Sequence, residues 1–303
     1  MAIICYASRW FEFPACIDFV QIPRSTRGRP PLSNPKGKAK DGLWGLWPSD
    51  GVVFDRTCTL CPRLAAFLAK GREAHPDYWC APVAPFGDRR ARLVIVGLAP
   101  GFHGANATGR PFTGDFAGVL LYRTLYRYGF ASRPESVSRD DGLELIDCRI
   151  TNSVKCVPPG NKPLPVEIRT CNRYLAAELE RHAPPGTVLL AMGSVGHQAA
   201  LRALGLKPSQ FAFSHGAEHR LPTGQTLLDS YHCSRYNTQT GRLTEAMFER
   251  VFARARELLG PAPRGPARAT PQATAGAASA DVRSAGVSSR RASARAKSGR
   301  AKS

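Results

Sequence analysis

The sequence predicts an α/β fold of three layers, in which helices cover both faces of a central, mainly parallel sheet of about four strands. Short apolar runs bounded by Gly, Pro and polar residues alternate along the chain with longer segments of helical periodicity. Strand–helix–strand order is typical of a parallel sheet that is buried on both faces. The 303 residues are 43% hydrophobic, which is enough for a sizeable core.

The elements follow one another in a regular order. The first strand is expected where four consecutive apolar residues precede a glycine-rich segment. Pro165 suits the first turn of a helix, and Thr244 followed by Glu245 suits the start of the last one. The expected strands are 92–98, 145–150, 187–192 and 226–231. The expected helices are 61–70, 116–128, 165–182, 194–203 and 244–258.

Positive charge is concentrated in two segments. The chain has 42 basic and 23 acidic residues, for a net charge of +19. Residues 23–40 hold six Lys or Arg and no acid, and 261–303 hold nine against Asp281 alone. We expect an unfolded basic extension over 1–40, a folded domain over 41–260 and an unfolded basic tail over 261–303. Such charge favours a polyanionic partner, either nucleic acid or an anionic membrane surface.

Composition also bears on the compartment. The sequence contains no apolar run of the ~20 residues that a membrane helix needs, and charges interrupt the somewhat apolar first twenty residues. Nine cysteines without a secretory signal suggest a reducing compartment, where cysteines are more often metal ligands or core thiols than disulfides. We therefore expect a cytoplasmic protein.

Polar or glycine-rich segments follow three of the expected strands: 97–118, 151–153 and 232–234. In a parallel sheet, ligands bind at the carboxyl ends of the strands, so these segments predict a site. The first segment matches neither the P-loop pattern nor the dinucleotide fingerprint. It contains Phe112 between a proline and a nearby glycine, and this ring either stacks on a base or fills the core.

Four cysteines have the spacing of a metal site. Cys58 and Cys61 form a C-x-x-C pair, and Cys156 and Cys171 form a second pair. Four thiolates suit either zinc or an iron–sulfur cluster, and the spacing does not separate the two. Cys80, in the same loop-rich region as the first pair, is the main competitor for a ligand position.

Two segments carry a family resemblance. GLAPG…HGAN…TGRPFTGD and YHCSRYNTQTGRLT resemble the type 5 uracil-DNA glycosylases, the iron–sulfur branch of the uracil-DNA glycosylase superfamily, over roughly residues 50–258. The resemblance implies a DNA repair enzyme that hydrolyses the glycosidic bond of uracil, and of other deaminated bases such as hypoxanthine and xanthine, leaving an abasic site. It also implies a structural [4Fe–4S] cluster on Cys58, Cys61, Cys156 and Cys171. We expect a monomer associated with the nucleoid.

The resemblance also implies catalytic roles. His232 would donate a hydrogen bond to the departing base, on which negative charge develops. Several branches of the superfamily have Asp or Asn at the position of Ala99, so this branch must position its water otherwise. Asn106 is the first candidate, and Asp115 the second, although an Asp before a helix is more often a cap.

Other residues would bind the base and open the duplex. The target nucleotide must leave the base stack before it can react. Phe112 would stack on the flipped base, Asn152 would read its edge, and backbone amides near Gly101 and Phe102 would add contacts, in a pocket widened by Ala99. Arg235 and Tyr236 would enter the duplex as a wedge.

Two alternatives remain open at this point. One is a type 4 uracil-DNA glycosylase with strict uracil preference, against which Leu98 argues, because that branch typically has Glu there. The other is a non-catalytic DNA-binding protein with a structural zinc. The basic flanks, with Arg27-Gly28-Arg29-Pro30 resembling the core of an AT-hook, would raise salt-dependent affinity for DNA in every case.

Overall fold

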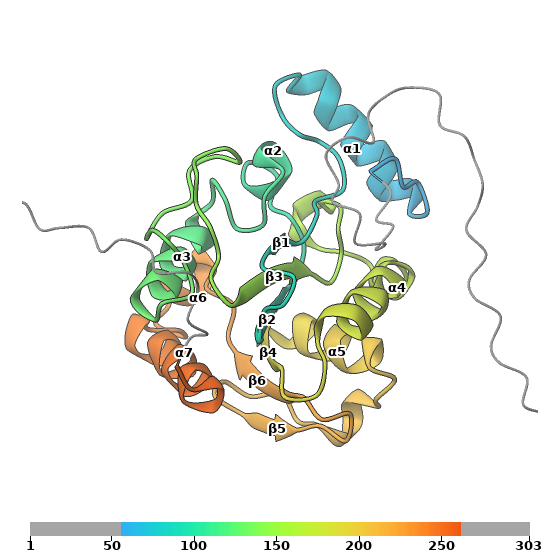
Figure 1. Cartoon of the computed structure of the whole chain (residues 1–303). Helices are drawn as coiled ribbons and strands as arrows, with labels where there is room; N and C mark the ends of the chain where they lie inside the picture. The colour runs from blue at the N-terminus through green and yellow to red at the C-terminus, as the bar shows by residue number, and fades with distance from the viewer. Residues whose placement is uncertain (1–55, 262–303) are drawn as a thin grey trace, which may run out of the picture. The chain divides into compact units, whose positions relative to one another are not determined.

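The computed structural model describes residues 56–261, which form three layers (Figure 1). The basic flanks expected over 1–40 and 261–303 lie outside these residues, apart from Pro261. Within 56–261, no helix combines the length and the apolar character that crossing a membrane requires.

A six-stranded sheet forms the middle layer, in the order β1-β3-β2-β4-β6-β5. Its four central strands are parallel, and they are the four that the sequence predicts. The two edge strands are antiparallel to their neighbours. The strands are β1 (Phe86–Gly87), β2 (Leu93–Gly97), β3 (Cys148–Asn152), β4 (Val188–Met192), β5 (Glu218–Arg220) and β6 (Thr226–Ser230).

Helices cover both faces of the sheet because the central strands are apolar on both sides. In β2, Leu93 and Ile95 point into one hydrophobic core, while Val94 and Val96 point into the other. One core is closed by α3 and α7, and the other by α4 and α5 (Figure 1). The helices are α1 (Pro62–Ala74), α2 (Ala105–Thr108), α3 (Phe116–Arg127), α4 (Pro165–His182), α5 (Ser194–Ala203), α6 (Arg235–Gln239) and α7 (Glu245–Leu259).

Two expected helix starts are confirmed. Pro165 is the first residue of α4, where its missing N–H costs nothing. Thr244 caps α7, because its hydroxyl accepts a hydrogen bond from the backbone N–H of Met247.

The structure differs from the sequence prediction at β3, which spans 148–152 and not 145–150. Asp147 has φ of +53°, which breaks the extended conformation just before the strand. Its carboxylate is bound by the guanidinium of Arg92 at 2.7 Å and by the Arg92 backbone N–H at 2.9 Å. Asp147 therefore joins the starts of β2 and β3 instead of continuing a strand.

The two strands and two α-helices that the sequence analysis did not predict are all short. The strands β1 and β5 have two and three residues, and the helices α2 and α6 have four and five. None is long enough to show a hydrophobic period.

Candidate functional site

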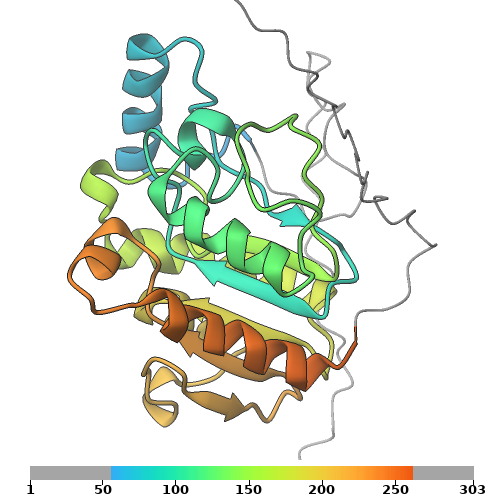
Figure 2. The ribbon, with the colours of Figure 1, turned by 90° about the vertical axis from the view of Figure 1, so that its left-hand side faces the viewer.

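A cavity of about 510 Å³ opens at the carboxyl ends of the parallel strands. Figure 2 shows these strands side on, with their carboxyl ends toward α6. The loop after β2 leads to α3 on one face and the loop after β4 leads to α5 on the other, so the chain diverges at this edge. Such a divergence leaves a crevice in which ligands of α/β proteins bind. The volume is in the range of small-molecule sites.

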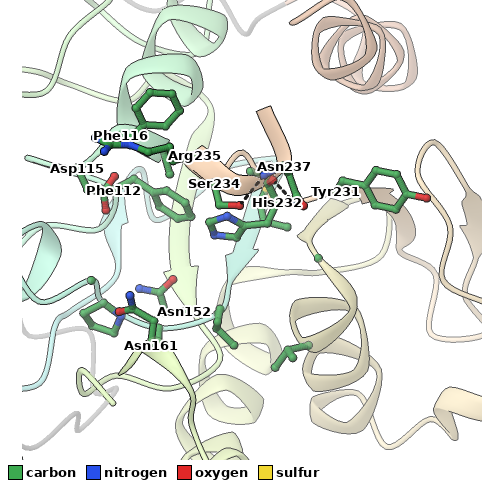
Figure 3. Close-up of a pocket in the computed structure, with 18 of the residues that line it drawn as sticks. Phe112, Asp115, Phe116, Asn152, Asn161, Tyr231, His232, Ser234, Arg235 and Asn237 are labelled. Atoms are coloured by element: carbon green, nitrogen blue, oxygen red, sulfur yellow. Dashed lines mark hydrogen bonds between the residues drawn. The ribbon is translucent and has the colours of Figure 1, made fainter. Parts of the chain in front are cut away.

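Three predicted side chains converge in this cavity: Phe112, Asn152 and His232 (Figure 3). The rings of Phe112 and His232 lie 5.8 Å apart between centroids and are inclined by 27°. Asn152 ends β3, where 97% of it is buried, and its Oδ1 atom has no hydrogen-bond partner among residues 56–261. An amide oxygen of this kind needs a donor from a ligand or from water.

The close approach of these side chains depends on Gly97. A Cβ atom at this position would lie 2.4 Å from Asn152 Oδ1 and 2.9 Å from the Phe112 ring. Any other residue would push both side chains out of place. The packing of Asn152 and Phe112 therefore requires a glycine at position 97, where the Gly-rich loop begins.

Phe112 is held in an uncommon conformation. Its φ is +54°, in the left-handed region that an aromatic residue rarely adopts. The Tyr122 hydroxyl donates to the carbonyl of Pro111 at 2.8 Å, and the absent side chain of Gly118 leaves room for the carbonyl of Phe112. The helix α3 thus fixes the turn that aims the Phe112 ring into the cavity.

His232 follows β6, and its ring is neutral at physiological pH. Burial lowers the pKa of His232 to about 4. Asn237 on α6 donates to the His232 carbonyl at 2.8 Å, and the Asn237 backbone N–H donates to Ser234 Oγ at 3.4 Å (Figure 3). A neutral imidazole retains one N–H that it can donate to a ligand.

Asp115 lines the cavity and also caps α3. Its Oδ1 atom accepts the backbone N–H of Gly118 at 2.8 Å. Burial raises the pKa of Asp115, although hydrogen bonds from the backbone N–H groups of Gly118 and Ala117 partly oppose the shift. A carboxylate beside a cavity with a raised pKa is suited to accepting a proton.

Asn106 does not reach the cavity. Its side chain is fully buried, and its Nδ2 atom donates to the carbonyl of Phe102 at 3.3 Å and to Cys80 Sγ at 3.4 Å. Phe102 also lies away from the cavity, where its ring packs 5.5 Å from those of Phe67 and His75. Of the two residues considered for positioning the water, only Asp115 lines the cavity.

The other predicted residues lie along the cavity or at its mouth. Ala99 and Gly101 line it, as expected. Arg235 lines it too, and its guanidinium lies 5.1 Å above the ring of Phe116, which is 41% exposed. Tyr236 is the next residue and is 70% exposed. Both predicted wedge residues thus lie in the first turn of α6.

Some lining residues were missed by the sequence analysis. Ser194 and Val195 bring the first turn of α5 to the cavity, and Asn161 comes from the segment between β3 and α4. Phe116 was taken only as the start of a helix. Small, apolar or isolated polar residues give no chemical signal in a sequence, although the position of 194–195 after a predicted strand could have drawn attention to them.

The four predicted cysteines line a second, smaller pocket between α1 and the start of α4. Cys171 Sγ accepts the backbone N–H of Lys155 at 3.3 Å, and Cys58 Sγ lies 3.4 Å from the hydroxyl of Tyr174. Burial, together with the neighbouring Cys171, Glu167 and Cys58, raises the pKa of Cys61 to about 11. A bound cation would favour the thiolate form and oppose this shift.

The spacing of these sulfur atoms bears on what they could hold. A tetrahedral zinc ion with Zn–S bonds of about 2.3 Å brings its sulfur ligands to about 3.8 Å from one another. Among residues 56–261, no three of the cysteine sulfurs all lie within 4.8 Å of one another. The arrangement is therefore wider than that of a single zinc ion. Cys80, the expected competitor, does not line this pocket.

One set of side chains does have metal-like spacing: His197, His219 and Asp229. His197 Nδ1 lies 2.8 Å from Asp229 Oδ1, and its Nε2 lies 3.0 Å from the carbonyl of Phe211. Burial lowers the pKa of His197, but the Asp229 carboxylate outweighs this and the net shift is upward. Both ring nitrogens of His197 thus face acceptors, an arrangement that suits a protonated imidazole. The contact with Asp229 connects α5 to β6.

Comparisons with known proteins agree on one family. The family model described as the uracil DNA glycosylase superfamily matches residues 84–256. The chain is 48% identical over 208 residues to the type-5 uracil-DNA glycosylase of Thermus thermophilus. The aligned region covers 67% of this chain and 94% of that protein. The chain is 42% identical over 210 residues to the type-5 enzyme of Mycobacterium tuberculosis, covering 67% and 78%. A type-4 uracil-DNA glycosylase of Thermotoga maritima is 37% identical over 109 residues, covering 36% and 48%.

Proposed function

The chain belongs to the uracil-DNA glycosylase superfamily, and we propose that it removes uracil from DNA by hydrolysing the bond between the base and deoxyribose, with the cavity as its active site. The observation that carries this assignment is the convergence of an aromatic ring, an amide and an imidazole in one cavity. The relatives that match two thirds of the chain are type-5 enzymes, whereas the type-4 relative matches about a third. The family model and the relatives do not support the alternative hypothesis of a non-catalytic DNA-binding protein with a structural zinc.

The base would be held by stacking and by its edge. A uracil flipped out of the duplex would lie against Phe112, whose ring is preset by its backbone. The unpartnered Oδ1 of Asn152 would accept the N3–H of uracil, and its amide N–H would donate to a ring carbonyl oxygen. The energy of these contacts would offset the cost of leaving the base stack.

The bond would break by stabilisation of the departing base. Uracil leaves with the bonding electron pair as an anion, while the sugar becomes cation-like. The neutral His232 would donate its N–H to the base oxygen on which this charge develops. Asp115 would orient a water toward the sugar carbon and accept one of its protons as the new C–O bond forms. The products are free base and an abasic site.

We propose that the pocket also admits other deaminated bases, such as hypoxanthine and xanthine. Ala99 contributes only a methyl group to the lining, and the cavity of about 510 Å³ leaves room for a purine. The test is an excision panel of uracil, hypoxanthine and xanthine opposite each base. Release of uracil alone would favour the strict preference expected of a type 4 enzyme.

We propose that Cys58, Cys61, Cys156 and Cys171 hold a [4Fe–4S] cluster. They line one pocket, their sulfurs are spaced too widely for one zinc ion, and four thiolates are the usual ligands of such a cluster. When bound, the cluster would cross-link the segment before α1 to the start of α4. Its role here is structural, and no catalytic step passes through it.

The cluster predicts a result for the cysteine variants. Cys171→Ala should abolish bound iron and the visible absorption of the purified protein and lower its unfolding temperature, because one of four ligands is lost. The matched control is Cys80→Ala, which should retain about four iron atoms per chain. Zinc in place of iron in the wild type, or iron retained by Cys171→Ala, would contradict the assignment.

The wedge predicts a difference between double- and single-stranded substrates. Tyr236→Ala should lower excision from duplex DNA by about tenfold, because stacking of an aromatic ring on a base contributes roughly 1–3 kcal/mol. Excision from single-stranded DNA, which has no gap to fill, should change much less. Tyr126→Ala, at a tyrosine exposed on α3 away from the cavity, is the control. An equal loss on both substrates would argue against a wedge.

We expect the enzyme to act as a monomer on DNA in the cytoplasm, and these two points stay predictions. Size-exclusion chromatography with light scattering tests the first.

A further inference from the structure

Another cavity, of about 370 Å³, lies at the end of the parallel strands opposite to the active site. It is formed by residues 89–92, which precede β2, by the last residues of α4 and by residues 184–187, which precede β4. These are the amino ends of the parallel strands, whose direction Figure 2 shows. The active site lies at the carboxyl ends of the same strands.

The lining of this cavity is strongly basic and contains no acidic residue. Arg92 is committed to Asp147 and donates to the carbonyl of Leu259, so its charge is balanced. Arg90 and Arg181 are exposed and form no ion pair within residues 56–261. The charge of Arg181 is not neutralised by any described acid at the cavity.

The cavity also includes exposed Arg89, which brings the exposed guanidinium groups to three. The dipole of α4 places about half a negative charge at the carboxyl end of the helix, and this partial charge repels an anion in the cavity. The two charges of Arg90 and Arg181 already exceed that contribution. Guanidinium groups form paired, charge-assisted hydrogen bonds with phosphate oxygens, so the chemistry of this lining suits a phosphate group.

We propose that this cavity binds the phosphate backbone of a second DNA segment while the active site is engaged with the first. This rests on the proposed function, because it takes DNA as the polyanion that the chain meets. A duplex seated at the active site cannot also reach this cavity, since the five-residue strands alone separate the two edges by about 17 Å. DNA is stiff over about 150 base pairs, so the phosphates must come from another segment.

Binding two segments at once has a kinetic consequence. The chain can be handed from one DNA to another through a complex with both, without being released into solution. Its dissociation from a first DNA then speeds up with the concentration of competing DNA, since the competitor enters the second site before the first DNA leaves.

The experiment uses the full chain and a short labelled duplex with a non-cleavable uracil analogue. Dissociation is followed at rising concentrations of unlabelled duplex for the wild type, for Arg89→Ala/Arg90→Ala/Arg181→Ala, and for the control Arg202→Ala/Arg220→Ala/Arg250→Ala, which removes the same charge from exposed positions outside both cavities. We expect the competitor-dependent rate to fall about tenfold in the first variant and to stay near the wild-type value in the control.

Further arms separate the possible outcomes. Excision from a short duplex with one uracil should be equal in all three proteins. Equal competitor dependence in both variants would overturn the proposal. A further outcome is that the first variant loses binding of inorganic phosphate while its dissociation rate still depends on competitor DNA as in the wild type. The cavity would then be a site for small anions, and this result would also overturn the proposal. An absence of excision in every protein would instead contradict the proposed function, and the dissociation result would stand by itself.

Discussion

Replacing His232 with alanine is expected to lower kcat for uracil excision by about 10²- to 10³-fold, the usual effect of removing one hydrogen-bond donor to a developing oxyanion. Negative charge appears on the base only as the glycosidic bond breaks. The His232 N–H is therefore most valuable in the transition state, and KM should change much less than kcat.

The control for this variant is His103→Ala, at an exposed histidine that does not line the cavity. It should keep kcat within about two- to threefold of the wild-type value, the scatter usual for surface substitutions. Single-turnover kinetics with excess enzyme measures the chemical step directly. Full activity in His232→Ala would show that another group stabilises the departing base.

The ionisation state of His232 adds a second expectation. Because its pKa lies near 4, the ring is neutral from about pH 5 upward and loses no proton between pH 5 and pH 8. A rate change in that window therefore reports on another group. If the wild-type rate fell with decreasing pH between pH 8 and pH 5, and this dependence disappeared in His232→Ala, a neutral donor would be contradicted.

Replacing Asp115 with asparagine is expected to lower kcat by about 10²- to 10⁴-fold, because an amide cannot accept the proton of the attacking water. Asparagine is as good a helix cap as aspartate, so α3 should keep its start and the variant should stay folded. The loss would then reflect chemistry and not stability.

The pH profile separates the two roles of Asp115. A base must be deprotonated, so excision by the wild type should fall as pH drops through the pKa of Asp115, which is raised above its ordinary value. This limb should be missing in Asp115→Asn. The comparison variant is Asn106→Ala, which removes the first candidate of the sequence analysis. A large loss of kcat in Asn106→Ala, with Asp115→Asn active, would restore that candidate.

The sequence was most informative where a pattern repeats. The four parallel strands and the five long helices each carry enough residues to show a period of two or of 3.6, or a continuous apolar run. The edge strands β1 and β5 are too short for this. The start of β3 was misplaced because the left-handed turn at Asp147 depends on its partner Arg92, 55 residues earlier in the chain.

The site could be predicted in part for a similar reason. Asn152 and His232 end or follow parallel strands, so topology alone brings them to one edge. Residues inside the Gly-rich loop were harder to place. Asn106 and Phe102 share that loop with Phe112, yet both turn away from the cavity, because the direction of each side chain depends on local turns and on partners such as Cys80.

The most direct test of the central claim is the amount of free uracil that the full chain releases from a duplex containing one uracil, measured by chromatography together with abasic sites. We predict that the wild type releases uracil and forms abasic sites in equal amounts, and that His232→Ala does both at least about 100-fold more slowly. A folded, full-length wild-type protein that leaves uracil attached to the DNA would contradict the account.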